Sequence, residues 1–245
     1  MTKLWLRDEH VMINECIFAD GYIEEDVRDF LSPACTDNLL LWGLPGTGKS
    51  AVVKAIAYER YGTTDLQDEN VVVLDCKDQE QAKQLNSKYL RGWYSWARLN
   101  SNCPILILDE LDELTDAQQR AFTAFINSSS SGERRSMVLA TTNVNLRDST
   151  ASAKAFSGAL LSRFNTKLQM RQQLPADVLP LAQRKLQAAN VLFDDAGLLD
   201  VLTRHCDPTS KTIDLRTVQT VVNKLIRRSS ITANQRPSRP GLQLV

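Results

Sequence analysis

The amino-acid sequence predicts an α/β domain with a parallel sheet, followed by a small domain made only of helices. Four apolar runs of strand length alternate with helical patterns before Arg171. Each run is continuously apolar, as a strand buried on both faces requires. After Arg171 only helical patterns follow. Strand–helix alternation of this kind is typical of α/β domains with a parallel sheet.

The first domain is built from these strands and the helices between them. A helix over Lys49–Tyr61 places its apolar residues on one face, and Gly62 is typical of a helix end. A second helix begins at Thr115, where Thr115 and Gln118 have the spacing of a capping box. The predicted strands are Leu39–Trp42, Val71–Leu74, Ile105–Leu108 and Met137–Thr141.

The second domain is expected to be all-helical. The domain boundaries that we expect are 1–173 for the α/β domain, 174–230 for the helical domain and 231–245 for a flexible tail. A hinge is expected near Leu174–Pro175. The predicted helices are Val178–Ala189, Ala196–His205 and Leu215–Arg227.

Composition excludes several classes of protein. The 245 residues are 43% apolar and 24% charged, close to globular averages and unlike disordered chains. The 29 basic residues balance the 29 acidic ones, so binding to nucleic acid would need a local basic patch. No apolar run is long enough to span a membrane. The five cysteines are scattered and lack metal-ligand spacing, which favours a reducing, cytoplasmic location without disulfides.

A phosphate-binding loop follows the first predicted strand. The segment Gly43–Ser50 matches G-x-x-x-x-G-K-[ST] between a strand and a helix. The glycines would keep Cβ atoms away from phosphate oxygens, and the helix beginning near Lys49 would present free N–H groups to the anion. Lys49 would reach the outer phosphates, and Ser50 would offer a hydroxyl to Mg²⁺. The residues expected to bind the nucleotide here are Gly43, Pro45, Gly46, Thr47, Gly48, Lys49 and Ser50.

A pair of acids follows the third predicted strand. Ile105–Leu108 ends in Asp109 and Glu110, which places two carboxylates at the carboxyl edge of the sheet beside the phosphate loop. Asp109 is expected to hold Mg²⁺ together with Ser50, and Glu110 to polarise the attacking water. Asp112 and Glu113 are interpreted as helix-start charges without a role in the chemistry.

With these two motifs the chain resembles the AAA+ ATPases, which implies a Rossmann-like core, a helical lid, ATP and Mg²⁺. Met137–Asn143 resembles the strand that ends in the sensor 1 residue, so Asn143 would position the water. Leu160–Phe164 resembles the arginine-finger segment, so Arg163 would act at a neighbouring subunit's γ-phosphate. Ile213–Arg216 resembles sensor 2, so Arg216 would contribute from the lid. The alternatives are a strand-end Asn turn, a surface arginine and an ordinary helix start.

Among AAA+ proteins the chain most resembles clamp-loader subunits of the replication factor C type. Three stretches carry this resemblance: Asn38–Ser50, Asp109–Gln119 and Ile213–Arg216. Three features depart from that family's pattern. Phe164 replaces the usual cysteine after the finger, residues 1–10 lack Tyr-Arg-Pro, and no C-terminal collar domain is expected. The resemblance implies neighbouring AAA+ subunits, identical or different, as partners, together with a sliding clamp and primed DNA.

One basic and aromatic segment, Lys88–Arg98, has three interpretations. It could bind DNA phosphates through Lys88, Arg91 and Arg98. It could instead be a pore loop that grips polypeptide. The simplest interpretation is a helix with its charges in solvent and with core-facing Tyr89, Trp93 and Trp96.

The sequence therefore predicts an ATP hydrolase with clamp-loader-like activity on DNA. A first alternative is a remodeller of a protein substrate, such as a helicase loader or an unfoldase. A second is an assembly protein gated by ATP that hydrolyses little of it, against which Glu110, Asn143 and Arg163 argue.

Overall fold

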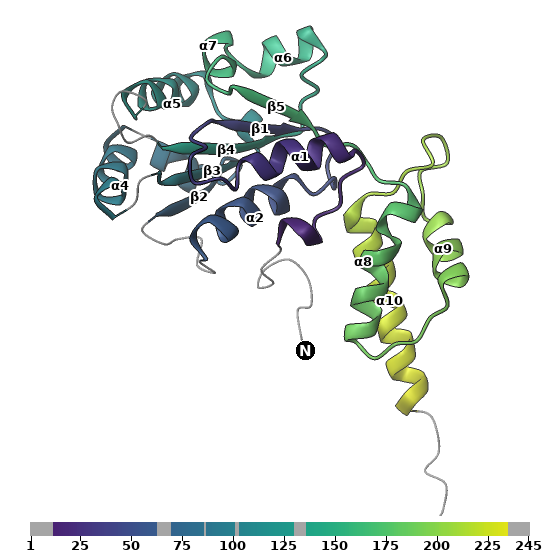
Figure 1. The fold of residues 1–245 in the computed structure, drawn as a ribbon. Coiled ribbons are helices and arrows are strands. Elements are labelled where there is room, and N and C mark those ends of the chain that lie inside the picture. The colour runs from purple at the N-terminus through teal and green to yellow at the C-terminus, as the bar shows by residue number, and fades with distance from the viewer. Residues whose placement is uncertain (1–11, 63–69, 86, 101–102, 130–135, 235–245) are drawn as a thin grey trace, which may run out of the picture. The chain divides into compact units, whose positions relative to one another are not determined.

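The computed structural model describes residues 12–62, 70–85, 87–100, 103–129 and 136–234. The chain divides into two compact units, with the division between Gln172 and Gln173. The first unit contains a sheet with helices packed on it, and the second contains helices (Figure 1). No helix within these described ranges is long and apolar enough to cross a membrane.

A five-stranded sheet forms the centre of the first unit. Its strand order is β2-β3-β4-β1-β5, and every neighbouring pair runs parallel. This order places β4 between β1 and β3, so the residues following β4 lie between those following β1 and β3. The strands are β1 (Leu39–Trp42), β2 (Val71–Asp75), β3 (Ile105–Asp109), β4 (Met137–Thr142) and β5 (Thr166–Gln169).

Helices and short 3₁₀ turns connect the strands of the first unit. The α-helices are α1 (Gly21–Asp29), α2 (Lys49–Tyr61), α3 (Gln79–Ala82), α4 (Ser87–Asn100), α5 (Asp116–Ser129), α6 (Ser149–Ala155) and α7 (Gly158–Leu161). The 3₁₀ turns are η1 (Ile13–Glu15), η2 (Lys83–Leu85) and η3 (Leu111–Glu113).

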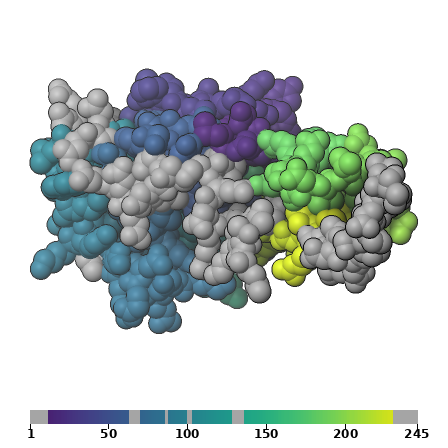
Figure 2. Space-filling view, turned by 90° about the horizontal axis from the view of Figure 1, so that it is seen from below, coloured from purple at the N-terminus to yellow at the C-terminus, as the bar shows by residue number. Residues whose placement is uncertain are grey.

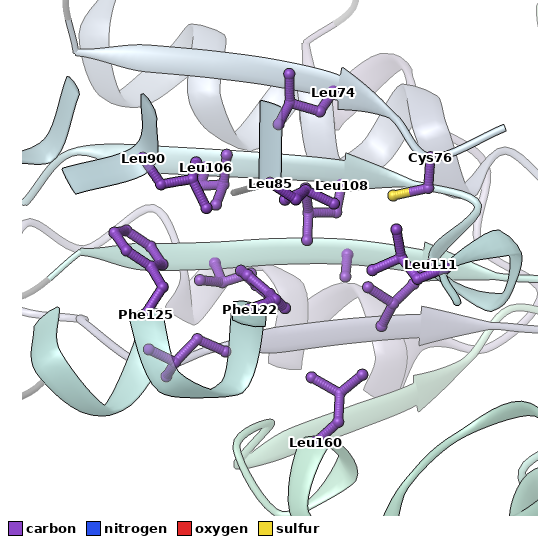
Figure 3. Close-up of a cluster of buried hydrophobic side chains, with 14 of the residues drawn as sticks. Leu74, Cys76, Leu85, Leu90, Leu106, Leu108, Leu111, Phe122, Phe125 and Leu160 are labelled. Carbon is purple, nitrogen blue, oxygen red and sulfur yellow. The ribbon is translucent and has the colours of Figure 1, made fainter. Parts of the chain in front are cut away.

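Alternate residues along the strands pack into two hydrophobic clusters, one on each face of the sheet. Leu40, Leu106 and Leu108 pack with apolar residues of α4, α5 and α7, which fill the cluster drawn in Figure 3. Leu39 and Leu41 pack on the opposite face with residues of α1 and α2. Figure 1 shows α1 and α2 on the same side of the sheet, and Figure 2 shows the outer surface of this layer in purple and blue. Burial on both faces explains why the central strands are continuously apolar.

The second unit consists of α8 (Pro175–Ala188), α9 (Asp195–Thr203) and α10 (Leu215–Asn234). Its own apolar core includes Val178, Leu198 and Val222, each fully buried. Ile213 joins this core and donates its backbone N–H to the carbonyl of Gln173 at 2.8 Å. The unit therefore has a hydrophobic core of its own.

Several expectations differ from the structure. The edge strand β5 was not expected, because Thr166–Gln169 contains a single apolar residue, Leu168, and is only partly buried. Helix α10 continues to Asn234, four residues into the stretch expected to be a tail, and residues 235–245 lie outside the described ranges. The helix α2 and its end at Gly62, whose φ is 59°, match the sequence-based expectation.

Helix α4 corrects the simplest interpretation of Lys88–Arg98. The segment is helical as expected, and Trp93 packs against the core. Tyr89 and Trp96 do not face the core, since their exposed fractions are 44% and 45%. The residues that α4 buries are Leu90, Tyr94 and Ala97, one helical position away from the stripe that we expected.

Candidate active site

The polar residues singled out by sequence meet at the carboxyl edge of the sheet. The phosphate loop follows β1, Asp109 ends β3, and Asn143 follows β4. These three strands are neighbours in the order β3-β4-β1, so their ends converge. Crevices at this edge are the usual ligand sites of open α/β sheets.

The phosphate loop has the backbone conformation that its glycines allow. Gly46 and Gly48 have φ angles of 78° and 91°, in the left-handed region where a side chain is costly. Gly48 is the N-terminal cap residue of α2, so the free N–H groups of the first turn follow it directly. Thr47 is buried and donates its hydroxyl to the carbonyl of Leu44 at 3.0 Å, while Pro45 is exposed.

Gly43 is required for a reason that the sequence did not indicate. A Cβ at this position would lie 2.1 Å from the carbonyl oxygen of Met170, and its φ is 145°. Met170 follows β5 and donates its N–H to the carbonyl of Trp42 at 2.7 Å. The expectation that Gly43 makes room for phosphate is therefore incomplete, because Gly43 is first of all the point where the chain after β5 approaches the loop.

The Lys49 ammonium is buried at the centre of the loop. It donates to the carbonyls of Gly43 and Leu44 at 2.9 and 2.8 Å. It also donates to Oδ1 of Asn143 at 3.0 Å. Carbonyl and amide oxygens thus solvate a cation that is only 6% exposed, and they hold it where phosphate oxygens would approach.

Ser50 and Asp109 form the pair that was expected to hold a metal ion. The Ser50 hydroxyl donates to Oδ1 of Asp109 at 2.7 Å, and the Thr141 hydroxyl donates to the same oxygen. Hydroxyl and carboxylate oxygens are the donors that Mg²⁺ prefers, so the residues fit this ion. In the part of the chain that the structure describes, no three His, Cys, Asp or Glu side chains cluster as a metal site. Mg²⁺ would be held by this pair together with substrate oxygens and water.

Glu110 lies at a strained turn directly after β3. Its φ and ψ are 57° and 53°, a left-handed conformation that costs a non-glycine residue about 1–2 kcal/mol. Its backbone N–H donates to the Thr141 hydroxyl at 3.1 Å, which helps to hold the turn. The Glu110 carboxylate lies 3.7 Å from the ammonium of Lys77. Strain of this kind persists where the surroundings fix it, and such residues cluster at active sites.

Asn143 is fixed by a residue to which the sequence assigned no chemical role. Oδ1 of Asp112 accepts the Thr142 hydroxyl at 2.7 Å and the Asn143 backbone N–H at 3.3 Å. Asp112 lies in the first turn of η3, as expected for a helix-start charge, and its carboxylate also holds the backbone after β4. The signal that could have found it is the polar triplet Thr141–Asn143, where a buried strand ends in three hydrogen-bonding side chains.

Arg163 lies at the opposite edge of the sheet. It follows α7, and its carbonyl accepts the side-chain amide of Asn38, the residue before β1, at 2.9 Å. Its Nε is buried and has no hydrogen-bond partner among the described residues, and within those ranges its guanidinium forms no ion pair. The structure therefore does not bring Arg163 together with Lys49 and Asp109 of the same chain.

Arg216 belongs to the second unit. Asp214 accepts the backbone N–H and the hydroxyl of Thr217 at 2.8 and 2.9 Å, as a helix N-terminal cap does. Arg216 is exposed on the first turn of α10. The sequence-based role of Arg216 stays a prediction.

A buried thiol adjoins the acidic pair. Cys76, labelled in Figure 3, follows β2 and donates its backbone N–H to the carbonyl of Asp109 at 2.9 Å. Burial raises the pKa of the Cys76 thiol, and the nearby carboxylates of Asp75 and Asp109 raise it further. The thiol stays neutral and unreactive at neutral pH, as expected for a structural cysteine.

Comparison with known proteins agrees with this geometry. Residues 39–172 match the family described as "ATPase family associated with various cellular activities (AAA)". Replication factor C subunit 3 of Saccharomyces cerevisiae is 28% identical over 121 aligned residues, and the match covers 45% of this chain. The match spans about a third of that relative, 32% of its length.

Solved structures support the fold. AMPPCP-bound DnaA from Aquifex aeolicus has a TM-score of 0.63 at 17% identity, covering 93% of this chain and 68% of that one. The RuvB Holliday junction branch migration motor of Thermotoga maritima has a TM-score of 0.62 at 17% identity, covering 89% and 64%. The family match covers more than half of the chain, including the phosphate loop and the acidic pair. The chain therefore belongs to the AAA family of ATPases.

Proposed function

We propose that this ATPase hydrolyses Mg·ATP at a site that two subunits complete together, and that it works on DNA as a clamp-loader-like subunit. The observation that carries the first part is the position of Arg163. The arginine is anchored at Asn38, before β1, whereas the phosphate loop follows Trp42 at the other end of β1. Four strand residues separate the two by about 13 Å, which is more than an arginine side chain spans.

The free charge carrier of Arg163 is its terminal guanidinium group. Among the described residues this guanidinium forms no ion pair. The Nε of Arg163 is buried within its own chain, so the terminal nitrogens would be the atoms that meet a γ-phosphate of a second subunit and stabilise charge that develops during transfer.

The remaining residues have separate tasks in this proposal. Lys49 and the first N–H groups of α2 bind the phosphates of the substrate. Glu110 orients and polarises the attacking water, and Asn143 positions that water from the side of Lys49. Mg²⁺, held by Ser50 and Asp109, would neutralise charge on the phosphates. Arg216 is proposed to contribute from the helical unit.

The test of the site separates binding from turnover. Arg163→Ala should leave the Kd for ATP nearly unchanged and lower kcat by about 10³-fold or more. Glu110→Gln should bind ATP without hydrolysing it and accumulate as an oligomer, which light scattering would detect. Unchanged turnover in Arg163→Ala would contradict a trans-acting arginine.

Two observations support DNA as the target. The matched relative is a replication factor, and α4 presents a basic and aromatic surface. Its outward residues include Arg91, Trp96 and Arg98, and α4 contains no acid. Primed DNA with a matching sliding clamp should raise the ATPase rate at a stated salt concentration. If neither stimulates turnover, a remodeller of a protein substrate becomes the better proposal.

We propose that the protein is located in a reducing compartment, the cytosol. None of the five cysteines forms a disulfide within the described ranges. Disulfides are rare in that compartment, where thiols are kept reduced.

A further inference from the structure

The side chain of Asn38 joins three segments at the amino edge of the sheet. Its Oδ1 accepts the backbone N–H of Val138, at the start of β4, at 2.9 Å. Its Nδ2 donates to the carbonyl of Arg163 at 2.9 Å. Its backbone carbonyl accepts the N–H of Thr166, where β5 begins, at 3.3 Å. One partner donates and the other accepts, so the two side-chain bonds define a single orientation of the amide.

The turn that carries Arg163 is held on both sides. Leu160 is fully buried and Phe164 is 1% exposed, and both belong to the cluster between the sheet and α5 (Figure 3 labels Leu160). The N–H of Arg163 donates to the carbonyl of Leu160 at 3.0 Å. The bond from Asn38 then fixes the carbonyl of Arg163, so its backbone is bonded on both sides while its Nε has no partner among the described residues.

We propose that Asn38 is a positioning residue for Arg163, which it holds in the orientation needed to act on a neighbouring subunit's ATP. This inference rests on the proposed function, in which Arg163 completes the neighbour's site. The side-chain hydrogen bonds of Asn38 go to Val138 and Arg163 and, among the described residues, not to its own phosphate loop, so Asn38 would act through the backbone of Arg163. The contribution of such an arginine depends on its placement, because a shift of about 1 Å can cost about 10²-fold in rate.

The inference makes an asymmetric prediction that a purely structural role does not make. Asn38 directly precedes β1, which leads to the chain's own phosphate loop. If Asn38 only stabilised β1, its loss would impair the site of the subunit that carries the substitution. If it positions Arg163, its loss impairs the site of the neighbouring subunit.

Two inactive variants allow these outcomes to be separated. Lys49→Ala subunits keep Arg163 but lose their own phosphate site, whereas Arg163→Ala subunits keep the phosphate site. An equal mixture should regain turnover where the two kinds of subunit adjoin. Asn38→Ala is then added to one kind of subunit at a time. The same substitution in the other subunit is the matched control for any loss of stability.

We expect Asn38→Ala in the Lys49→Ala subunit to lower the restored kcat by about tenfold or more. In the Arg163→Ala subunit it should change kcat by less than about twofold, because no arginine remains there to be positioned. Equal losses in both arrangements, or no loss in the first, would overturn the inference. A mixture without any turnover before Asn38 is changed would instead contradict the proposed function.

A second measurement uses the single chain and does not depend on assembly. Amide hydrogen exchange of the peptide Gly158–Asn165 should become faster by about fivefold in Asn38→Ala, the factor that corresponds to one lost hydrogen bond. Exchange of the peptide Gly43–Ser50 should not change. If Asn38→Ala fails to fold, Asn38→Asp replaces it, since it keeps the acceptor for Val138 and removes the donor to Arg163. Unchanged exchange over Gly158–Asn165 overturns the inference.

Discussion

At the scale of single residues, the role of a motif residue depends on its contacts with residues far away in the sequence. Gly43 has φ 145° and faces the carbonyl of Met170, whereas Gly62 is left-handed with open space around it. Replacing Gly43 with alanine would place Cβ 2.1 Å from that carbonyl, so β1 and the chain after β5 would have to separate.

Gly43→Ala should therefore lower the melting temperature strongly even without nucleotide. Gly62→Ala is the matched control, since it introduces only the left-handed penalty of about 1–2 kcal/mol. Thermal unfolding of both variants measures the difference. Equal melting temperatures for the two variants would show that the contact with Met170 does not restrict Gly43.

Substitution of Asp112 tests whether the hydrogen bonds that hold Thr142 and Asn143 contribute to turnover. Asp112→Ala removes the acceptor of the Thr142 hydroxyl and of the Asn143 N–H, so kcat should fall by about 10–100-fold with little change in KM for ATP. Asp112→Asn keeps an acceptor oxygen and should restore most of kcat. Steady-state kinetics give kcat and KM for ATP of both variants. Equal losses in both variants would indicate that the charge matters rather than the hydrogen bonds.

The raised pKa of the Cys16 thiol predicts that the protein loses stability at alkaline pH. Burial raises the pKa of this thiol from 9.0 to about 12, and the carboxylates of Glu15, Glu59 and Glu24 add to the shift. Between these values the folded protein keeps a proton that the unfolded chain has lost. Stability therefore falls as pH rises above about 9, by up to about 1.4 kcal/mol per pH unit.

Cys16→Ala should remove this part of the pH dependence. Denaturant unfolding of wild type and variant at about pH 8 and about pH 10.5 gives the two slopes, and the wild type should lose more stability over that interval. Parallel slopes would contradict the assignment to Cys16. The remaining cysteines are present in both proteins, so the difference isolates this thiol.

At the scale of helices and strands, the sequence predicted what periodicity can reveal. Strands β1 to β4 and helix α2 were placed closely, because apolar runs and a helix that ends at a glycine have strong local patterns. Strand β5 was missed because its four residues are only partly buried and include a single apolar one, Leu168. The phase of α4 was wrong because two apolar stripes, one through Tyr89 and Trp96 and one through Leu90 and Ala97, lie one residue apart.

The proposed binding of DNA by the exposed face of α4 can be tested by substitution. If it binds single-stranded DNA, Trp96→Ala should weaken binding by about 1–3 kcal/mol through lost base stacking. Arg91→Ala should reduce the slope of log Kd against log salt by about 0.7 if it contacts one phosphate. Fluorescence anisotropy at several salt concentrations measures both.

The matched control is an exposed aromatic residue on another helix. Tyr22, on α1, is 78% exposed, and Tyr22→Ala should leave DNA binding unchanged. Wild-type binding in both α4 variants would remove the nucleic-acid interpretation of this helix and leave protein as the candidate substrate.

At the scale of the whole molecule, we propose that one sheet carries two different half-sites. The carboxyl edge gathers Lys49, Asp109 and Asn143, and the amino edge carries Arg163. The sequence predicted the members of both sets through motifs and family resemblance. The resemblance already implied that Arg163 acts on a neighbouring subunit, but no local pattern could predict the bond from Asn38, 125 residues away, that anchors Arg163 at the amino edge.

A site divided in this way makes turnover depend on assembly. The most direct measurement is the ATPase rate per subunit over a wide range of protein concentration, with the molecular mass followed by light scattering in the same samples. Our account predicts that the rate per subunit rises with concentration and levels off once the oligomer has formed. A rate per subunit that stays constant while the protein remains monomeric would contradict it.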